Sequence, residues 1–141
     1  MSGLFSQKLP SRTISDYWIY AERKHGKYPD HAARGGKWLV FVGDQNIDRI
    51  WTKIRITTEG GRLGSMSKVA TAKFNPDFSN AKAKVICVYT YDWRDEQDVK
   101  RVREELRKIG IARKIAYKTD EDTDRGEYRS TGAKNISNYY E

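Results

Sequence analysis

The chain has few of the residues that define several common classes of protein. Its 141 residues include one cysteine, Cys87, so neither a disulfide within the chain nor a zinc site of several cysteines can form. No apolar run approaches the roughly 18 residues that a membrane-spanning helix needs. The N-terminus also lacks the apolar stretch of a signal peptide. We therefore expect a cytoplasmic protein that does not cross a membrane.

Apolar residues are also scarce, at 38% of the chain, below the usual share of about 45–50%. Aromatic residues make up 12%, with four Trp and nine Tyr, whereas disordered chains are poor in aromatics. The composition predicts a folded domain whose modest core is rich in aromatic side chains. We expect a flexible tail over residues 1–13, which show no periodicity, and a single domain over residues 14–141.

Positive charge is concentrated in the first half of the chain. Lys and Arg number 27 against 19 Asp and Glu, a net charge of +8. Residues 1–74 hold 13 of the basic and 6 of the acidic side chains, so nearly all of the excess lies there. A basic excess of this kind indicates an anionic partner, such as RNA, a nucleotide or a phosphoprotein. The alternative is a solvated basic surface without a specific partner.

The hydrophobic pattern predicts an α+β domain. Apolar residues recur at the spacing of a helix from Ile47 to about Thr57, and again behind the acidic residues Asp92, Asp95 and Glu96, with Gly110 as the end of the second helix. Short β-prone or alternating runs surround these helices, at residues 14–21, 37–42, 66–74, 84–91 and 111–118. Residues 22–36 form a basic loop. The order of these elements favours a mainly antiparallel sheet.

Residues able to catalyse a reaction are few. Both histidines, His25 and His31, lie in the expected loop, where a histidine is usually a solvent-exposed bystander. Cys87 lies within the strongest strand pattern, where a thiol is usually buried and inert. Residues 60–65 are rich in glycine but lack the Lys-Ser/Thr ending of a phosphate-binding loop. We expect no metal site and no cofactor.

Basic and aromatic side chains offer a stronger signal for binding. Stacking of a base on an aromatic ring, with Lys or Arg on the phosphate, is a common way to bind nucleotides and single-stranded RNA. Trp51 and Trp38 fall on apolar faces and are predicted core residues, which leaves Trp18 and Trp93 as stacking candidates. The predicted phosphate contacts are Lys68, Lys73, Arg62 and Arg34, and Lys37 is a further basic residue at a loop edge that could contact phosphate. Regular alternation places Lys68 and Lys73 on opposite faces of their strand, so a bulge or the strand end would have to bring them together.

Several segments together resemble one family. They are the run Gly35–Phe41, the helix with Asp48 and Trp51, the run 68–72, the strand 85–90, and the stretches 117–120 and 122–123. Over residues 17–141 the chain resembles the basophilic-leukaemia-expressed protein family, whose fold is like that of the cap-binding translation initiation factor 4E. The resemblance implies a curved antiparallel sheet backed by helices.

The resemblance also implies two kinds of site. In cap-binding proteins two Trp side chains sandwich a methylated guanine while basic residues hold the triphosphate; Lys68 and Lys73 lie in the corresponding region, and Trp18 is a candidate for one wall. Some family members are named after a phosphothreonine lyase domain. That name implies elimination of phosphate from phosphothreonine, with Lys68 or Lys73 as base and His31 as general acid.

Three functional hypotheses follow. The first is a module that binds RNA, a nucleotide or another phosphate-bearing ligand. The second is a phosphothreonine lyase-like enzyme, and the third is a protein-interaction module that uses the tyrosines at 128, 139 and 140. The sequence leaves open which of them holds and in what oligomeric state the protein works.

Overall fold

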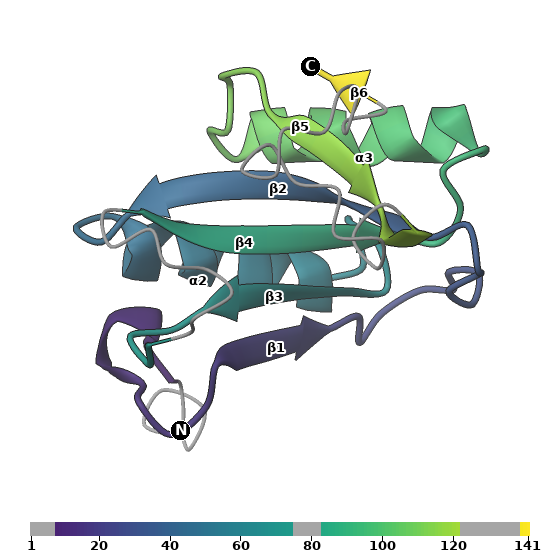
Figure 1. Ribbon diagram of the computed structural model, residues 1–141. Coiled ribbons are helices and arrows are strands. Elements are labelled where there is room, and N and C mark those ends of the chain that lie inside the picture. The colour runs from purple at the N-terminus through teal and green to yellow at the C-terminus, as the bar shows by residue number, and fades with distance from the viewer. Residues whose placement is uncertain (1–7, 75–82, 122–138) are drawn as a thin grey trace.

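The fold is one antiparallel sheet with two helices against one of its faces (Figure 1). The computed structural model describes residues 8–74, 83–121 and 139–141. Within these ranges the strand order is β1-β3-β4-β2-β5-β6, and every neighbouring pair is antiparallel. The strands are β1 (Trp18–Glu22), β2 (Gly36–Gly43), β3 (Met66–Ala70), β4 (Ala83–Thr90), β5 (Ala116–Thr119) and β6 (Tyr139–Tyr140).

The helices cover the sheet because each buries one apolar stripe. Helix α2 (Ile47–Glu59) buries Ile47, Trp51 and Ile54, which recur at the spacing of one helix face. Helix α3 (Glu96–Lys108) begins where Asp95 accepts a hydrogen bond from the backbone N–H of Asp98, and it buries Val99, Val102 and Leu106. Both stripes pack on one face of the sheet, and Trp38 and Trp51 lie in this core as predicted.

The opposite face of the sheet carries a smaller apolar cluster. Val85, Cys87 and Tyr89 of β4 are buried there, with Trp18 and Leu39 packed against them. In the described ranges, no helix covers this face (Figure 1). Polar side chains can therefore share it with the cluster, as the next subsection shows.

The strand expected over residues 66–74 ends earlier, at Ala70. The side chain of Thr71 is the physical reason. Its hydroxyl donates to the carbonyl of Asp16 and accepts from the backbone N–H of Lys73 at 3.2 Å, which turns the chain away from the sheet. The alternation over residues 66–70 is as predicted, with Ser67 and Val69 buried on the helix side.

Both ends of the chain differ from expectation. Residues 10–13, assigned to a flexible tail, are ordered: Pro10–Arg12 form a short 3₁₀ helix (η1), and Pro10 is buried. The backbone N–H of Ser11 donates to Asp48 of α2 at 2.9 Å, which fixes this segment. At the other end, Tyr139–Tyr140 add the strand β6 to β5, which the sequence pattern did not predict. Residues 1–7 and Tyr128 lie outside the described residues.

The last expected strand, over residues 111–118, starts only at Ala116. The buried guanidinium of Arg103 explains this difference, because it donates to the carbonyls of Ile111 at 2.9 Å and Arg113 at 2.7 Å. It also donates to the carbonyl of Glu141 at 2.7 Å. Arg103 thus holds the α3–β5 connection and the residue after β6 in one place.

Candidate functional site

Five neighbouring strands each place one polar or aromatic side chain on the face opposite the helices. We call this surface the lysine face and define it by Trp18 (β1), Lys68 (β3), Tyr89 (β4), Lys37 (β2) and Lys118 (β5). The register brings them together: Lys37 is paired with both Tyr89 and Lys118, and Lys68 with Cys87. Because side chains alternate along a strand, these positions all lie on the face opposite the apolar core.

Lys68 lies at the centre of the lysine face. Its Nζ is 4.0 Å from the centre of the Trp18 ring and 5.9 Å from that of Tyr89. In the described part of the chain, no carboxylate forms an ion pair with Lys68. Burial lowers the pKa of Lys68, and the nearby positive charge of Lys37 lowers it further. Among the described residues, the ammonium is therefore half-buried against two aromatic rings and in no ion pair, with the charge of Asp120 as a smaller opposing influence on its pKa.

Asp120, just after β5, joins two other groups at the edge of this face. Its carboxylate accepts from Lys37 Nζ at 3.1 Å and contacts His31 Nε2 at 2.5 Å. The ring of His31 also packs edge-on against Tyr89, with centres 5.9 Å apart. Gly35 makes this approach possible, because a Cβ atom there would lie 2.1 Å from His31 Nε2. The structure thus brings both His31 and Lys68 to the ring of Tyr89.

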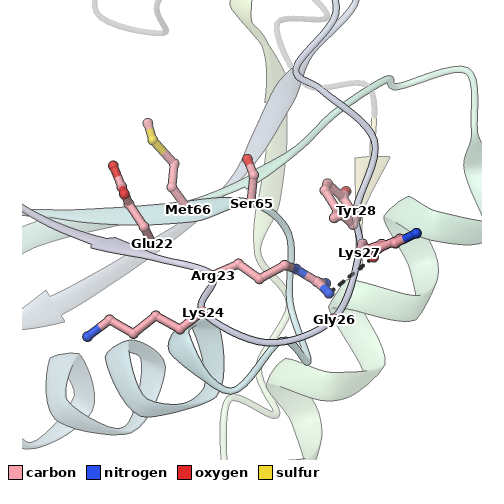
Figure 2. A pocket seen from close by; sticks show the side chains of 8 residues that line it. All are labelled: Glu22, Arg23, Lys24, Gly26, Lys27, Tyr28, Ser65 and Met66. Carbon is pink, nitrogen blue, oxygen red and sulfur yellow. Dashed lines mark hydrogen bonds between the residues drawn. The ribbon is translucent and has the colours of Figure 1, made fainter.

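A hollow of about 610 Å³ lies where β1 ends and β3 begins, two residues along β3 from Lys68 (Figure 2). Glu22 and Met66, paired across β1 and β3, form the wall nearest Lys68, and the loop after β1 forms the rest. Arg23 shapes this loop: its guanidinium donates to the carbonyls of Leu63 at 2.6 Å and Gly64 at 3.2 Å, and packs 4.8 Å from the centre of the Tyr28 ring. Figure 2 shows Lys24 and Lys27 pointing in opposite directions, so their charges do not converge on one point.

Two of the predicted phosphate contacts are engaged by carboxylates. Arg34 donates to Asp92 at 2.8 and 3.1 Å, which raises the pKa of Arg34 and lowers that of Asp92. Arg62 donates to Glu105 of α3 at 3.0 Å. Neither residue lies on the lysine face. A carboxylate therefore already offsets the charge of each arginine.

Of the remaining predicted residues, some lie on the lysine face and some lie away from it. Trp18 and Lys68 lie together on the lysine face. Lys73 lies just beyond the end of β3, with its Nζ 4.4 Å from the centre of the Tyr17 ring. Trp93 is half-buried against the main core, and its carbonyl accepts from the hydroxyl of Tyr139 at 3.1 Å. The structure therefore brings together Trp18, Lys68 and His31, and places Lys73 and Trp93 elsewhere.

Three residues of the site were not singled out from the sequence: Tyr89, Lys118 and Asp120. The alternation within residues 84–91 does place Cys87 and Tyr89 on one face. What the pattern lacks is the order of strands, which places Lys37 and Lys118 beside Tyr89. Among the described residues, no three His, Cys, Asp or Glu side chains gather closely enough to hold a metal ion.

Comparison with known proteins defines the family. The family model for Basophilic leukemia-expressed protein Bles03 matches residues 29–124, about two thirds of the chain. This range includes His31, Lys37, Lys68 and Tyr89 as well as both helices. The chain belongs to this family.

A solved structure confirms the fold. The chain is similar to schistosome eIF4E, crystallised in complex with m7GpppA and 4E-BP, with a TM-score of 0.67 over 99% of this chain and 78% of that one. The two sequences are 14% identical. The α+β fold with a curved antiparallel sheet backed by helices is thus the eIF4E-like fold predicted from the sequence. In the described ranges, no helix is long and apolar enough to cross a membrane.

Proposed function

We propose that the lysine face binds a phosphate-bearing ligand, a nucleotide or single-stranded RNA, with Lys68 on the phosphate and Trp18 beneath the base. The observation that carries this proposal is the environment of Lys68. A half-buried ammonium next to a second lysine is costly for the fold unless an anion offsets it. Within the described residues, no carboxylate pairs with Lys68.

The neighbours of Lys68 fit a nucleotide better than a bare anion. Trp18 is half-buried at the edge of the sheet, and its ring supplies an aromatic surface for a base. Its contact with the ammonium at 4.0 Å keeps cation and ring together, so one ligand can contact both. The similar fold of eIF4E, solved with the nucleotide m7GpppA, supports the same ligand class.

In this proposal, the other predicted residues do not contact the phosphate or the base at the centre of the lysine face. Lys73 is an outer contact near the end of β3, for a ligand long enough to reach Tyr17. Arg34 and Arg62 contribute to the general positive field rather than to direct contacts, because each already donates to a carboxylate. Trp93 packs against the main core and is not assigned a base. We place this activity in the cytoplasm.

The test is binding of a fluorescently labelled short RNA and of GTP to the full chain and to Lys68→Met. We expect the variant to bind both ligands more weakly, and the slope of log K against log salt for RNA to fall by about 0.7 for the lost contact. Lys100→Gln is the matched control. Lys100 is an exposed lysine of α3, and α3 packs on the other face of the sheet. Equal affinities in wild type and Lys68→Met would contradict the proposal.

A second candidate function has its own observation in favour of it. His31 and Lys68 contact the same aromatic ring, Tyr89, and burial lowers the pKa of Lys68 toward that of a usable base. In a phosphothreonine lyase-like reaction, neutral Lys68 would take the Cα proton while the Cβ–O bond breaks and a Cα=Cβ double bond forms. Phosphate would leave with a proton from His31.

Mass spectrometry of a phosphothreonine peptide incubated with the protein separates the two functions. The lyase predicts a peptide that has lost phosphoric acid, and both Lys68→Met and His31→Gln would abolish that product. Binding of the peptide with no change in its mass supports the binding module alone. If neither RNA, GTP nor phosphopeptide binds, a protein-interaction module that uses Tyr139 and Tyr140 becomes the better account.

A further inference from the structure

A second concentration of positive charge lies on the helix side of the molecule, away from the lysine face. Where β2 ends, α2 begins and the chain leaves α3, the structure has a hollow of about 390 Å³. Its charged side chains are Arg49 and Lys53 of α2 and Arg113 of the α3–β5 connection. We call this site the basic hollow and define it by these three residues.

Among the residues that the structure describes, each of these cations contacts only uncharged acceptors. Arg49 donates to the side-chain oxygen of Asn46 at 3.3 Å, Lys53 to the carbonyl of Ile109 at 3.3 Å, and Arg113 to the carbonyl of Phe41. In the described part of the chain, none of the three forms an ion pair with a carboxylate. A guanidinium has five N–H donors and an ammonium three, so each side chain keeps donors for a ligand.

The acidic residues nearest in sequence are already engaged. Asp44 accepts from Lys84 Nζ at 2.8 Å, and Asp48 accepts from both the backbone and the hydroxyl of Ser11. The described residues that line the hollow include no Asp or Glu. The basic hollow therefore carries three positive charges without a compensating carboxylate in its walls. Its lining differs in this respect from that of the hollow where β1 ends and β3 begins, which contains Glu22.

The fold fixes the positions from which these cations extend. Arg49 and Lys53 are four residues apart, so they project from one side of α2. Gly110 turns the chain after α3 with a φ of 105°, in the region that favours glycine, and it lines the hollow beside Lys53. Arg103 then holds the carbonyl of Arg113, which anchors the backbone from which the third cation reaches β2.

We propose that the basic hollow is a binding site for a compact polyphosphate, such as pyrophosphate or the diphosphate of an esterified ligand, separate from the lysine face. Two guanidinium groups offer paired N–H donors that match the oxygens of a phosphate, and the lysine adds a third charge. The volume lies within the range of small-molecule sites. The proposal does not depend on the function assigned to the lysine face.

The test is titration of inorganic pyrophosphate into the full chain carrying Lys68→Met, followed by calorimetry and ³¹P NMR. This background removes the central cation of the lysine face. We expect saturable binding of one pyrophosphate, weakened about tenfold or more when Arg49→Gln and Lys53→Gln are added together, and likewise by Arg113→Gln. Adding Lys100→Gln instead should change the affinity less than about twofold, because Lys100 lies outside the hollow; it removes one positive charge, as Arg113→Gln does.

Thermal unfolding of each variant shows whether it is folded, and circular dichroism checks its helix content. A second titration with glycerol phosphate separates recognition of a diphosphate from recognition of any phosphate ester. Absence of saturable pyrophosphate binding below about 10 mM in the Lys68→Met chain would overturn the proposal. So would equal affinities with and without Arg49→Gln and Lys53→Gln in folded protein.

Discussion

Replacing Lys68 by Met should weaken ligand binding while changing the stability of the fold only slightly. The side chain keeps its length and still packs on Trp18, but the half-buried ammonium disappears, and with it the repulsion from Lys37. The loss is the contact of the ammonium with the Trp18 ring at 4.0 Å, a kind of interaction that contributes about 0.5–1 kcal/mol at exposed sites. These effects oppose each other, so the net change in the free energy of unfolding is small.

The magnitudes for stability and for binding differ enough to be told apart. For a domain of 141 residues, a change of 1 kcal/mol in the free energy of unfolding shifts the Tm by about 3 °C. We therefore expect the Tm of Lys68→Met to be no more than about 3 °C below that of the wild type, or to be above it. A charged hydrogen bond to phosphate contributes about 1.5–3 kcal/mol. Its loss corresponds to a fall in affinity of about 10- to 150-fold.

The pH dependence of stability tests whether the buried charge of Lys68 is the cause of the difference between the wild type and Lys68→Met. The pKa of Lys68 is lower in the folded protein than in the unfolded chain, so the unfolded chain binds more protons between these two values. The cost of the buried charge is therefore fully present below the folded pKa and disappears as the pH rises past the unfolded value, about 10.4. The free energy of unfolding of the wild type should therefore increase relative to that of Lys68→Met as the pH rises from 7 toward 10.

Thermal unfolding at pH 7 and at pH 10, together with anisotropy measurements of labelled RNA binding, tests whether Lys68 is a ligand contact or a structural residue. A fall in Tm of more than about 5 °C in Lys68→Met, with unchanged RNA affinity, would refute the reasoning and make Lys68 a structural residue. Lys68→Arg is a useful companion, since it keeps the charge over Trp18 and should retain most of the binding.

Three further outcomes follow from the structure. Arg103→Met should cost about 2–4 kcal/mol in urea denaturation, because three carbonyls, those of Ile111, Arg113 and Glu141, lose their charged donor; a change below about 0.5 kcal/mol would contradict this. Burial raises the pKa of Cys87 to about 11, so the native thiol should not react with Ellman's reagent at pH 8 but should do so in urea; rapid reaction of the folded protein would show that the strand opens. The hydrogen bond from Arg34 lowers the pKa of Asp92, so its stabilisation is present above the unfolded pKa of about 3.9 and is lost as the pH falls through the lower folded value. Asp92→Asn should therefore lower the urea midpoint at pH 7 and approach the wild type near pH 3, and an equal difference at both pH values would exclude this ion pair as the cause.

The sequence predicted those parts of the fold that local periodicity determines. The stripe of Ile47, Trp51 and Ile54 predicts α2, and the alternation around Ser67 and Val69 predicts which face of β3 is buried. The ends of elements depend on single contacts that no pattern contains. Thr71 ends β3 through bonds to Asp16 and Lys73, and Asp48 orders residues that look like a tail through its bonds to Ser11.

The candidate site was only half predictable for the same reason. Trp18, Lys68 and His31 could be selected by residue type. The structure brings Lys68 and His31 to the ring of Tyr89, and Trp18 to the ammonium of Lys68. Arg34 and Arg62 looked equally suitable, but their carboxylate partners, Asp92 and Glu105, lie 58 and 43 residues away in the chain. Residue type shows what a side chain can bind, whereas tertiary structure decides what it already binds.

The strand order also determines when in folding the lysine face can exist. Its five residues are spread from position 18 to position 118, and each comes from a different strand, so no short stretch of the chain contains even half of it. Closing such long loops is slow, and the site forms only once β1, β3, β4, β2 and β5 are assembled. A ligand that needs all five therefore binds the finished sheet and not its precursors. At a concentration of about 100 times its Kd, such a ligand would add about 2.7 kcal/mol to the stability of the whole domain, not just of one loop.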